Sequence, residues 1–242
     1  MRTAYREHLD NFSHDLIIMG ETVKKIMSNA SDALINRSLD PAEEAISLNE
    51  ELDEVRSRCE ERAVLLLALE NPMAKDLRQV VSSIYIVEDF YRMGQLSRHI
   101  AKAARRRHPD PVIPKEYTGI FEEMVRLVLE MSDTIQEILI NPDPDLALAL
   151  STDDDAVDDL NAHVLNTLTQ REWKGTVREA VETAQITRYY ERYADHCVQV
   201  AGRMIYLVTG LVPDKYQEKL KQEARDAEFD QRMADLEKQF RS

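Results

Sequence analysis

The sequence predicts an all-α protein made of two tandem three-helix bundles that are related by an internal duplication, with an extra polar helix at the C-terminus. Glycine is rare, at 6 of 242 residues, and aromatic residues make up 6%, a composition that favours long helices over sheets rich in tight turns. Breaks that contain proline, together with a turn at Gly175, divide residues 1–212 into six long segments, three on each side of a central break. The third and sixth segments also match each other position by position, which indicates the duplication.

The first half contains three expected helices, separated by local signals. Asp40 is a good N-cap residue for the second helix, Pro41 suits its first helical position, and Glu43 follows as a capping-box partner. The pair Asn71-Pro72 separates the second helix from the third. The expected helices span residues 5–36, 41–69 and 72–107.

A proline-rich break at residues 108–114 is the expected boundary between the halves. Three more helices follow, and Gly210 and Pro213 stop the last of them. The tail beyond has seven Lys and Arg against eight Asp and Glu, so we expect a loosely attached polar helix. The expected units are a first bundle (1–111), a second bundle (112–212) and the tail (213–242), and the helices of the second bundle span 116–140, 144–173 and the stretch from a turn at Gly175 to Thr209.

The duplication is visible when each residue of the third helix is compared with the residue 100 positions later in the sixth. Five of the eight pairs that we compared are identical, and no gap is needed to align them. Chance is a poor explanation for this agreement, so we interpret the halves as related bundles. The identical pairs are Arg78 and Arg178, Val81 and Val181, Ile86 and Ile186, Arg92 and Arg192, and Ala101 and Ala201.

The composition excludes several classes of function. A formal net charge of −14 argues against binding to nucleic acid, because neutralising phosphates requires a basic surface. The N-terminus has no apolar signal core, and the longest apolar run, residues 204–212, is too short to span a bilayer. Cys59 and Cys197 lack metal-site spacing and are expected to be buried small hydrophobic residues. We therefore expect a soluble cytoplasmic protein.

The sixth helix carries two acids within an apolar stripe. Glu191 and Asp195 lie one turn apart, and burying such a pair is costly unless a cation or strong donors neutralise it. A positive partner is therefore expected there, either a metal ion or Arg188 and Arg192 on the same helix. The stripe is expected to consist of Val177, Val181, Ala184, Val198, Ile205 and Val208.

The fifth helix begins with a run of acids at residues 153–159. If the fifth and sixth helices are antiparallel neighbours, Asp154, Asp155 and Asp158 can meet the two acids of the sixth. Converging carboxylates without a thiolate suit Mg²⁺, Mn²⁺ or Fe. The alternative for Asp153 and Asp159 is a solvated acidic face, which the helix dipole also favours. His163 and His196 are nearby candidate ligands, although a single helical histidine is more often a hydrogen-bonded structural residue.

These features resemble the PhoU family, whose members are regulators associated with bacterial phosphate uptake. In the second half the resemblance rests on YYERYADHCVQVAGRMIYLVTG (189–210) and DDDAVDDL (153–160). In the first half it rests on residues 67–89 and 92–107. The resemblance covers residues 5–212 and leaves the tail outside it.

The resemblance implies a non-enzymatic, homodimeric adaptor that links the ATPase subunit of a phosphate ABC transporter to a sensor histidine kinase. Such an adaptor keeps phosphate-starvation genes off when phosphate is plentiful, and it is peripheral at the membrane through its partners. Family members carry metal clusters on E-x-x-x-D motifs. By position, Glu191 and Asp195 are the expected ligands of a divalent or ferric ion (Mg, Mn, Fe or Zn), and Asp155, Asp158 and Asp154 are expected to contribute.

The first half departs from the family pattern. Tyr91 and Gln95 stand where the sixth helix has its two acids, and neither side chain supplies negative charge to a hard cation. A weaker site remains conceivable there, formed by Glu50, Asp53, Glu88 and Asp89.

Two other classes of function stay open at this point. One is a metal-dependent helical enzyme, such as a carboxylate-bridged oxidase or a phosphohydrolase, but none of the six histidines follows a glutamate by three positions. The other is a structural helical scaffold with acids on its surface. We do not expect direct phosphate sensing, because the sequence shows no anion-binding loop.

Overall fold

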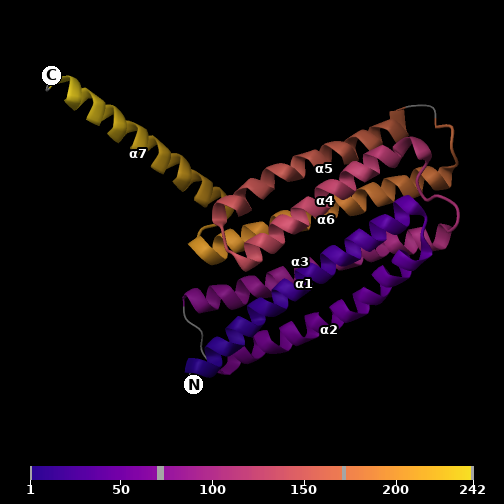
Figure 1. Ribbon diagram of the computed structural model, residues 1–242, viewed down its shortest axis with the longest axis horizontal. Coiled ribbons are helices and arrows are strands. Elements are labelled where there is room, and N and C mark those ends of the chain that lie inside the picture. The colour runs from indigo at the N-terminus through magenta and orange to yellow at the C-terminus, as the bar shows by residue number, and fades with distance from the viewer. Residues whose placement is uncertain (1, 70–73, 171–172, 241–242) are drawn as a thin grey trace.

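The computed structural model describes residues 2–69, 74–170 and 173–240, and within these ranges it is all-helical (Figure 1). As the sequence predicts, three long helices precede the central break, and three long helices and the C-terminal helix follow it. The helices are α1 (Arg2–Asn36), α2 (Leu39–Leu69), α3 (Lys75–Arg107), the short 3₁₀ helix η1 (Lys115–Tyr117), α4 (Thr118–Ile140), α5 (Pro144–Gln170), α6 (Val177–Thr209) and α7 (Pro213–Phe240).

The two bundles lie side by side and share one hydrophobic core (Figure 1). Helices α1, α2 and α3 pack against one another, as do α4, α5 and α6, while α3 packs on α6 and α1 on α4. Helices α3 and α6 are antiparallel, because Asp89 meets His196 near one end of the contact and Arg106 meets Glu182 near the other. This contact, the α3–α6 seam, joins the halves.

The start and end of α6 follow from local chemistry. Thr176 caps the helix, since its hydroxyl accepts a hydrogen bond from the Glu179 backbone N–H and the Glu179 carboxylate accepts one from the Thr176 backbone N–H. At the other end Gly210 adopts a left-handed conformation (φ 76°), which glycine reaches without a Cβ penalty. These two caps fix the register of the helix that carries the candidate site.

Two expected helix ends are wrong. Helix α2 begins at Leu39, so Asp40 lies in its first turn rather than at its N-cap, and Glu43 pairs with Arg105 of α3 instead of closing a capping box. Helix α5 ends at Gln170, three residues before the expected end. Trp173 lies outside the helix because its indole N–H donates to the Thr176 carbonyl (2.8 Å) at the start of α6.

The apolar stripe expected on α6 is also wrong in part. Val177, Val181 and Val208 are exposed to 79%, 50% and 38%. Because α3, α4 and α5 all pack against α6, its buried surface is wider than one stripe in the middle and narrow at the ends. The buried apolar side chains are Ile186, Tyr190, Tyr193, Ala194, Cys197, Val200, Ala201, Met204 and Ile205.

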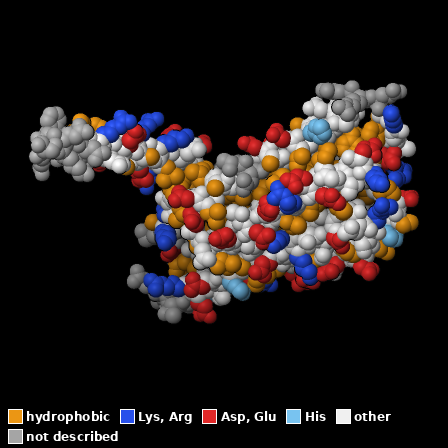
Figure 2. Space-filling view, turned by 45° about the horizontal axis from the view of Figure 1, so that its top comes forward, with side chains coloured by type: hydrophobic (Ala, Val, Ile, Leu, Met, Phe, Trp, Pro, Cys, Tyr) orange, Lys and Arg blue, Asp and Glu red, His pale blue; other side chains and the backbone are white. Residues whose placement is uncertain are grey.

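Helix α7 confirms the expected extra C-terminal helix and projects away from the bundles (Figure 1). Its first turns attach to the body, where the Tyr216 hydroxyl donates to Asp145 (2.7 Å) and Leu220 packs against the core. Figure 2 shows charged side chains of both signs along its projecting part. Among the described residues, none of the helices combines the length and the apolar character that a membrane span needs.

Candidate metal centre

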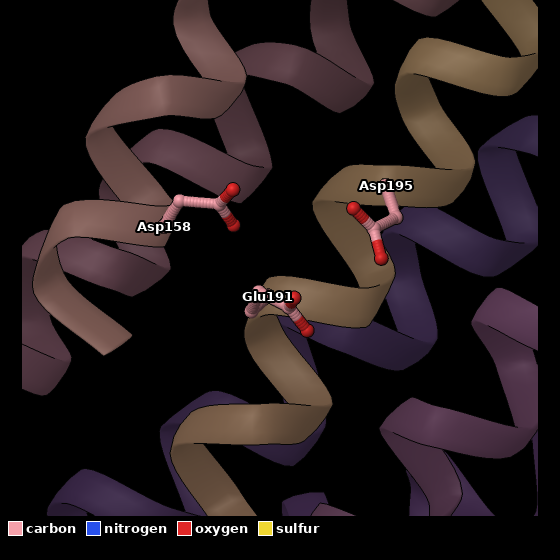
Figure 3. Close-up of side chains that lie close together, drawn as sticks. All are labelled: Asp158, Glu191 and Asp195. Carbon is pink, nitrogen blue, oxygen red and sulfur yellow. The ribbon is translucent and has the colours of Figure 1, made fainter. Parts of the chain in front are cut away.

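Three carboxylates from two helices converge in the second bundle (Figure 3). Asp158 comes from α5, and Glu191 and Asp195 come from successive turns of α6. One carboxylate oxygen of each residue lies within 4.8 Å of one of each of the others. We call this group the acidic triad. Among the described residues it is the one group of three or more potential ligands with this spacing.

The packing of α5 on α6 builds the triad. Val157 and Val164 of α5 are fully buried and hold that helix against the core, which leaves the adjacent Asp158 at the edge of the α5–α6 contact. On α6 the spacing of four residues puts Glu191 and Asp195 on one face. The sequence predicted that acids of the fifth helix meet Glu191 and Asp195, and of the acids named there the described group contains Asp158.

Negative charge in the triad is only partly balanced. Glu191 is 6% exposed and its Oε1 pairs with Arg188, one turn earlier, whereas its Oε2 is buried without a hydrogen-bond partner. Burial, followed by repulsion from Asp195, raises the pKa of Glu191 above its ordinary value. The same two causes, in the same order, raise the pKa of Asp158. The folded chain therefore holds these carboxylates where ionisation is unfavourable.

A hard cation fits this arrangement. Three carboxylates oppose one paired arginine, and the buried Oε2 of Glu191 lacks a partner, so a positive ion would supply what the protein leaves unpaired. Oxygen donors without a thiolate suit Mg²⁺, Mn²⁺ or iron. Asp158, Glu191 and Asp195 would hold the ion. The pairing of Glu191 with Arg188 shows that the alternative partner expected from the sequence is also present.

The remaining acids expected at this centre lie differently. Asp155 and Asp159 are exposed, and neither belongs to the triad. The side chains of Asp153 and Asp154 lie outside the described residues. His163 is exposed, whereas His196 is buried and turned toward α3, where its Nδ1 lies 3.0 Å from Asp89 Oδ1.

The structure does not gather the four acids of the weaker first-half site. Glu50 and Asp53 are exposed on α2, and Glu88 binds Arg56 (2.7 Å). Asp89 instead reaches across the seam to His196. In the part of the chain that the structure describes, these acids form no group of three within ligand distance.

The sequence analysis did not identify Arg56, which supplies positive charge beside Glu88 and Tyr91 in the first bundle. The Arg56 guanidinium lies 4.2 Å from the centre of the Tyr91 ring, and Tyr91 is the repeat equivalent of Glu191. Arg56 also pairs with Glu60 and Glu88. A basic residue within the run of acids on α2 was the available signal.

Comparison with known proteins identifies the fold and the family. The family model described as "PhoU domain" matches residues 16–104 and, a second time, residues 121–204. The chain belongs to the PhoU family. The two matches of one PhoU model confirm the internal duplication.

Curated PhoU relatives align over nearly their full length. The protein named phosphate-specific transport system accessory protein PhoU homolog 2 of Mycobacterium tuberculosis is 44% identical over 213 residues, which cover 88% of this chain and all of the relative. The PhoU homolog 1 of Mycobacterium leprae is 42% identical over 88% of this chain and 96% of its own length.

Solved PhoU structures share the fold. The crystal structure of PhoU from Pseudomonas aeruginosa has a TM-score of 0.80 and 25% identity, with coverage of 86% of this chain and 100% of that chain. The regulatory protein PhoU from Streptococcus pneumoniae has a TM-score of 0.77 with 86% of this chain and 98% of that chain covered, and at 23% identity it supports the fold alone.

Proposed function

We propose that this PhoU-family protein is a regulatory, non-enzymatic accessory protein of phosphate-specific transport. The observation that carries this proposal is the 44% identity over the full length of a relative that bears that accessory name. In this role the protein works in the cytoplasm as a homodimer and links the ATPase subunit of a phosphate ABC transporter to a sensor histidine kinase. It restrains phosphate uptake and starvation signalling when phosphate is plentiful.

The proposal includes a metal ion at the acidic triad. Asp158, Glu191 and Asp195 bind a divalent or ferric ion, and Asp155, earlier on the same helix as Asp158, contributes to its negative surroundings. The unpartnered Oε2 of Glu191 and the raised pKa values of Glu191 and Asp158 support this assignment. The ion supplies positive charge that fixes α5 against α6, so the surface offered to partners depends on metal.

Gene deletion tests the regulatory role. A strain that lacks the gene is grown in high phosphate while a phosphate-starvation reporter is measured. We expect the reporter to rise, and we expect the wild-type gene to restore repression. Unchanged repression in the deletion strain would contradict the proposal.

Elemental analysis of the purified protein tests the metal assignment. We expect bound metal in the wild type and its loss in the double variant Glu191→Gln, Asp195→Asn. The variant Gln95→Asn, at the repeat-equivalent position of Asp195, serves as the matched control and should keep the metal. Equal metal content in all three proteins would contradict the assignment, and metal-dependent turnover of a substrate would identify an enzyme instead.

A further inference from the structure

A basic groove lies along the α3–α6 seam, outside the acidic triad. It has a volume of about 490 Å³, which is within the range of small-ligand sites. Its described lining contains three arginines and two histidines and no Asp or Glu, although the chain has a net charge of −14. The lining residues are Tyr91, Arg92, Gln95, Leu96, His99, Arg188, Tyr189, Arg192 and His196.

The duplication explains why arginines converge here. Arg92 and Arg192 are identical residues at equivalent positions of the two repeats. Because α3 and α6 cross antiparallel, with residue 89 beside 196 and 106 beside 182, the approximate twofold axis between the repeats passes close to residues 93 and 193. Residues next to such an axis are brought together from both copies. The same arginine of the two repeats thus lines one groove twice.

The two axial arginines are available to a ligand. Within the described residues neither Arg92 nor Arg192 makes a hydrogen bond or an ion pair, and both are exposed. The third arginine, Arg188, is half-exposed and is held by Glu191. By contrast, Arg56, Arg58 and Arg126 lie outside the groove and pair with acids. Two of the three arginines that line the groove therefore make no ion pair with a described residue.

The positive charge continues along the seam. A second cavity of about 130 Å³ shares His99 and Tyr189 with the groove and adds Lys102 and Arg106. The ring of His99 stacks on Tyr189, with centroids 5.3 Å apart. Burial, then Lys102 and Arg98, lower the pKa of His99, as expected where the surroundings are already positive. The one acid that lines this second cavity, Glu182, already pairs with arginine.

We propose that this groove binds a small anion that carries more than one phosphoryl group, such as a polyphosphate or the triphosphate of a nucleotide. Guanidinium groups match phosphate oxygens in geometry and charge. Two arginines that line one groove, with Lys102 and Arg106 farther along it, suit a chain of phosphates better than a single phosphate. The site is made of side chains from two helices rather than a glycine-rich loop, so a search for phosphate-binding loops does not find it. The expectation that phosphate itself is not sensed directly stays a prediction, which the titration with inorganic phosphate below also tests.

Calorimetric titration of the full-length protein tests the site. The protein is freed of metal with a chelator and dialysed, because phosphates bind metal themselves, and it is then titrated with tripolyphosphate, ATP or inorganic phosphate. We expect tripolyphosphate and ATP to bind, and inorganic phosphate to bind more weakly than either. Tripolyphosphate binding as tight as ATP binding assigns the affinity to the phosphates alone, and tighter ATP binding adds stacking of the base on Tyr189.

The double variant Arg92→Gln, Arg192→Gln is expected to bind tripolyphosphate at least about tenfold more weakly, since each arginine contributes a charge-assisted hydrogen bond. The matched control is Arg225→Gln, Arg232→Gln on α7, which removes the same charge from an exposed region outside the groove. It should bind as the wild type does. In the wild type, the NMR signals of the His99 ring should shift on titration.

Three results would overturn the proposal. One is the absence of tripolyphosphate and ATP binding to the wild type, and another is equal affinity in the Arg92 and Arg192 double variant. The third is a glutamate-rich peptide that binds as tightly as tripolyphosphate, which would make the groove a docking surface for a protein. The titration is made without metal and does not measure regulation, so its failure would leave the accessory role and the metal assignment standing.

Discussion

The two bundles arrange charge differently at equivalent positions. In the first, Arg56 of α2 lies over the Tyr91 ring and binds Glu88 of α3. In the second, Asp158 of α5 lies beside Glu191 and Asp195 of α6. At position 88 of the first repeat stands a glutamate, and at position 188 of the second an arginine.

The two bundles differ in the source of the positive charge that balances their acids. The first bundle carries it covalently, as the guanidinium of Arg56. The second has three acids against Arg188 and leaves a buried oxygen of Glu191 without a partner. Around Tyr91 the first bundle therefore pairs its charges within the chain, whereas around Glu191 the second bundle leaves a place for the ion that we propose. Each prediction below tests this contrast.

The largest expected effect is stabilisation of the second bundle by metal. Adding Mn²⁺ to metal-free protein at about 100 times its dissociation constant should stabilise the fold by about 2.7 kcal/mol, which raises Tm by roughly 5–10 °C for a chain of this size. Calorimetric melting with and without Mn²⁺ measures this shift. In Glu191→Gln, Asp195→Asn the shift should vanish, and in Gln95→Asn it should persist. A full shift in the first variant would break the contrast.

A smaller effect separates the two arginines. Arg56→Met removes a cation–π contact and a partly exposed ion pair, so we expect a loss of about 1 kcal/mol that Mn²⁺ does not restore. Arg188→Met leaves the buried Glu191 carboxylate uncompensated in metal-free protein, and here Mn²⁺ should restore the stability. Melting curves of both variants with and without the ion decide the matter. Equal rescue of both variants would refute the assignment of one centre to one bundle.

The pH dependence sharpens the comparison further. The pKa values of Glu191 and Asp158 are raised in the fold, so folded metal-free protein binds more protons than the unfolded chain above the ordinary values of 4.5 and 3.8. Stability is lost as pH rises through the raised pKa values. Asp195→Asn removes a repelling charge from both groups and should raise the Tm of metal-free protein at pH 7 but not at pH 4.

The control for this prediction is Asp159→Asn, an exposed neighbour outside the triad, which should change the metal-free Tm little at either pH. With Mn²⁺ present at pH 7, Asp195→Asn should have a lower Tm than the wild type, because the wild type then binds the ion and the variant does not. A variant that stays more stable than the wild type in Mn²⁺ would exclude a metal at this place.

The smallest effect is expected from the tail. Helix α7 is attached to the body through Tyr216 and Leu220, and the described side chains beyond them are exposed. Removal of residues 221–242 should leave Tm and its metal dependence within about 1 °C of the wild type, since surface changes away from packed contacts cost little. A larger loss of Tm would show that the tail supports one of the bundles.

The sequence predicts the architecture well because long helices leave strong local signals. The proline breaks, the rarity of glycine and the gapless match between the third and sixth helices determine the six-helix order and the duplication. Helix ends were predicted less well, because tertiary contacts override local caps, as at Glu43 and Trp173. The predicted single apolar stripe of α6 was wrong in part, because a helix with three packing partners buries more than one face.

The acidic triad follows from spacing on two neighbouring helices, which the sequence shows. The partners of individual charges do not follow from it, because ion pairs join residues far apart in the chain. Arg56 over Tyr91 and His196 beside Asp89 are examples. The basic groove could not be predicted from the sequence either, because Arg92 and Arg192 line one groove only when the two repeats pack against each other.

Because the two repeats lie in one chain, their sequences at the α3–α6 seam can differ from each other. In a dimer of two identical three-helix chains the contact would be isologous, so every pair across it would occur twice. Here the segment 108–114 joins the two copies in one chain. The repeat equivalents of Asp89 and His196 are Tyr189 and Leu96, so the ion pair does not occur a second time on the other side of the axis. Because the contact between the copies need not be self-complementary, the two bundles can pair their charges differently. The first pairs Glu88 with Arg56, and the second brings Asp158, Glu191 and Asp195 together.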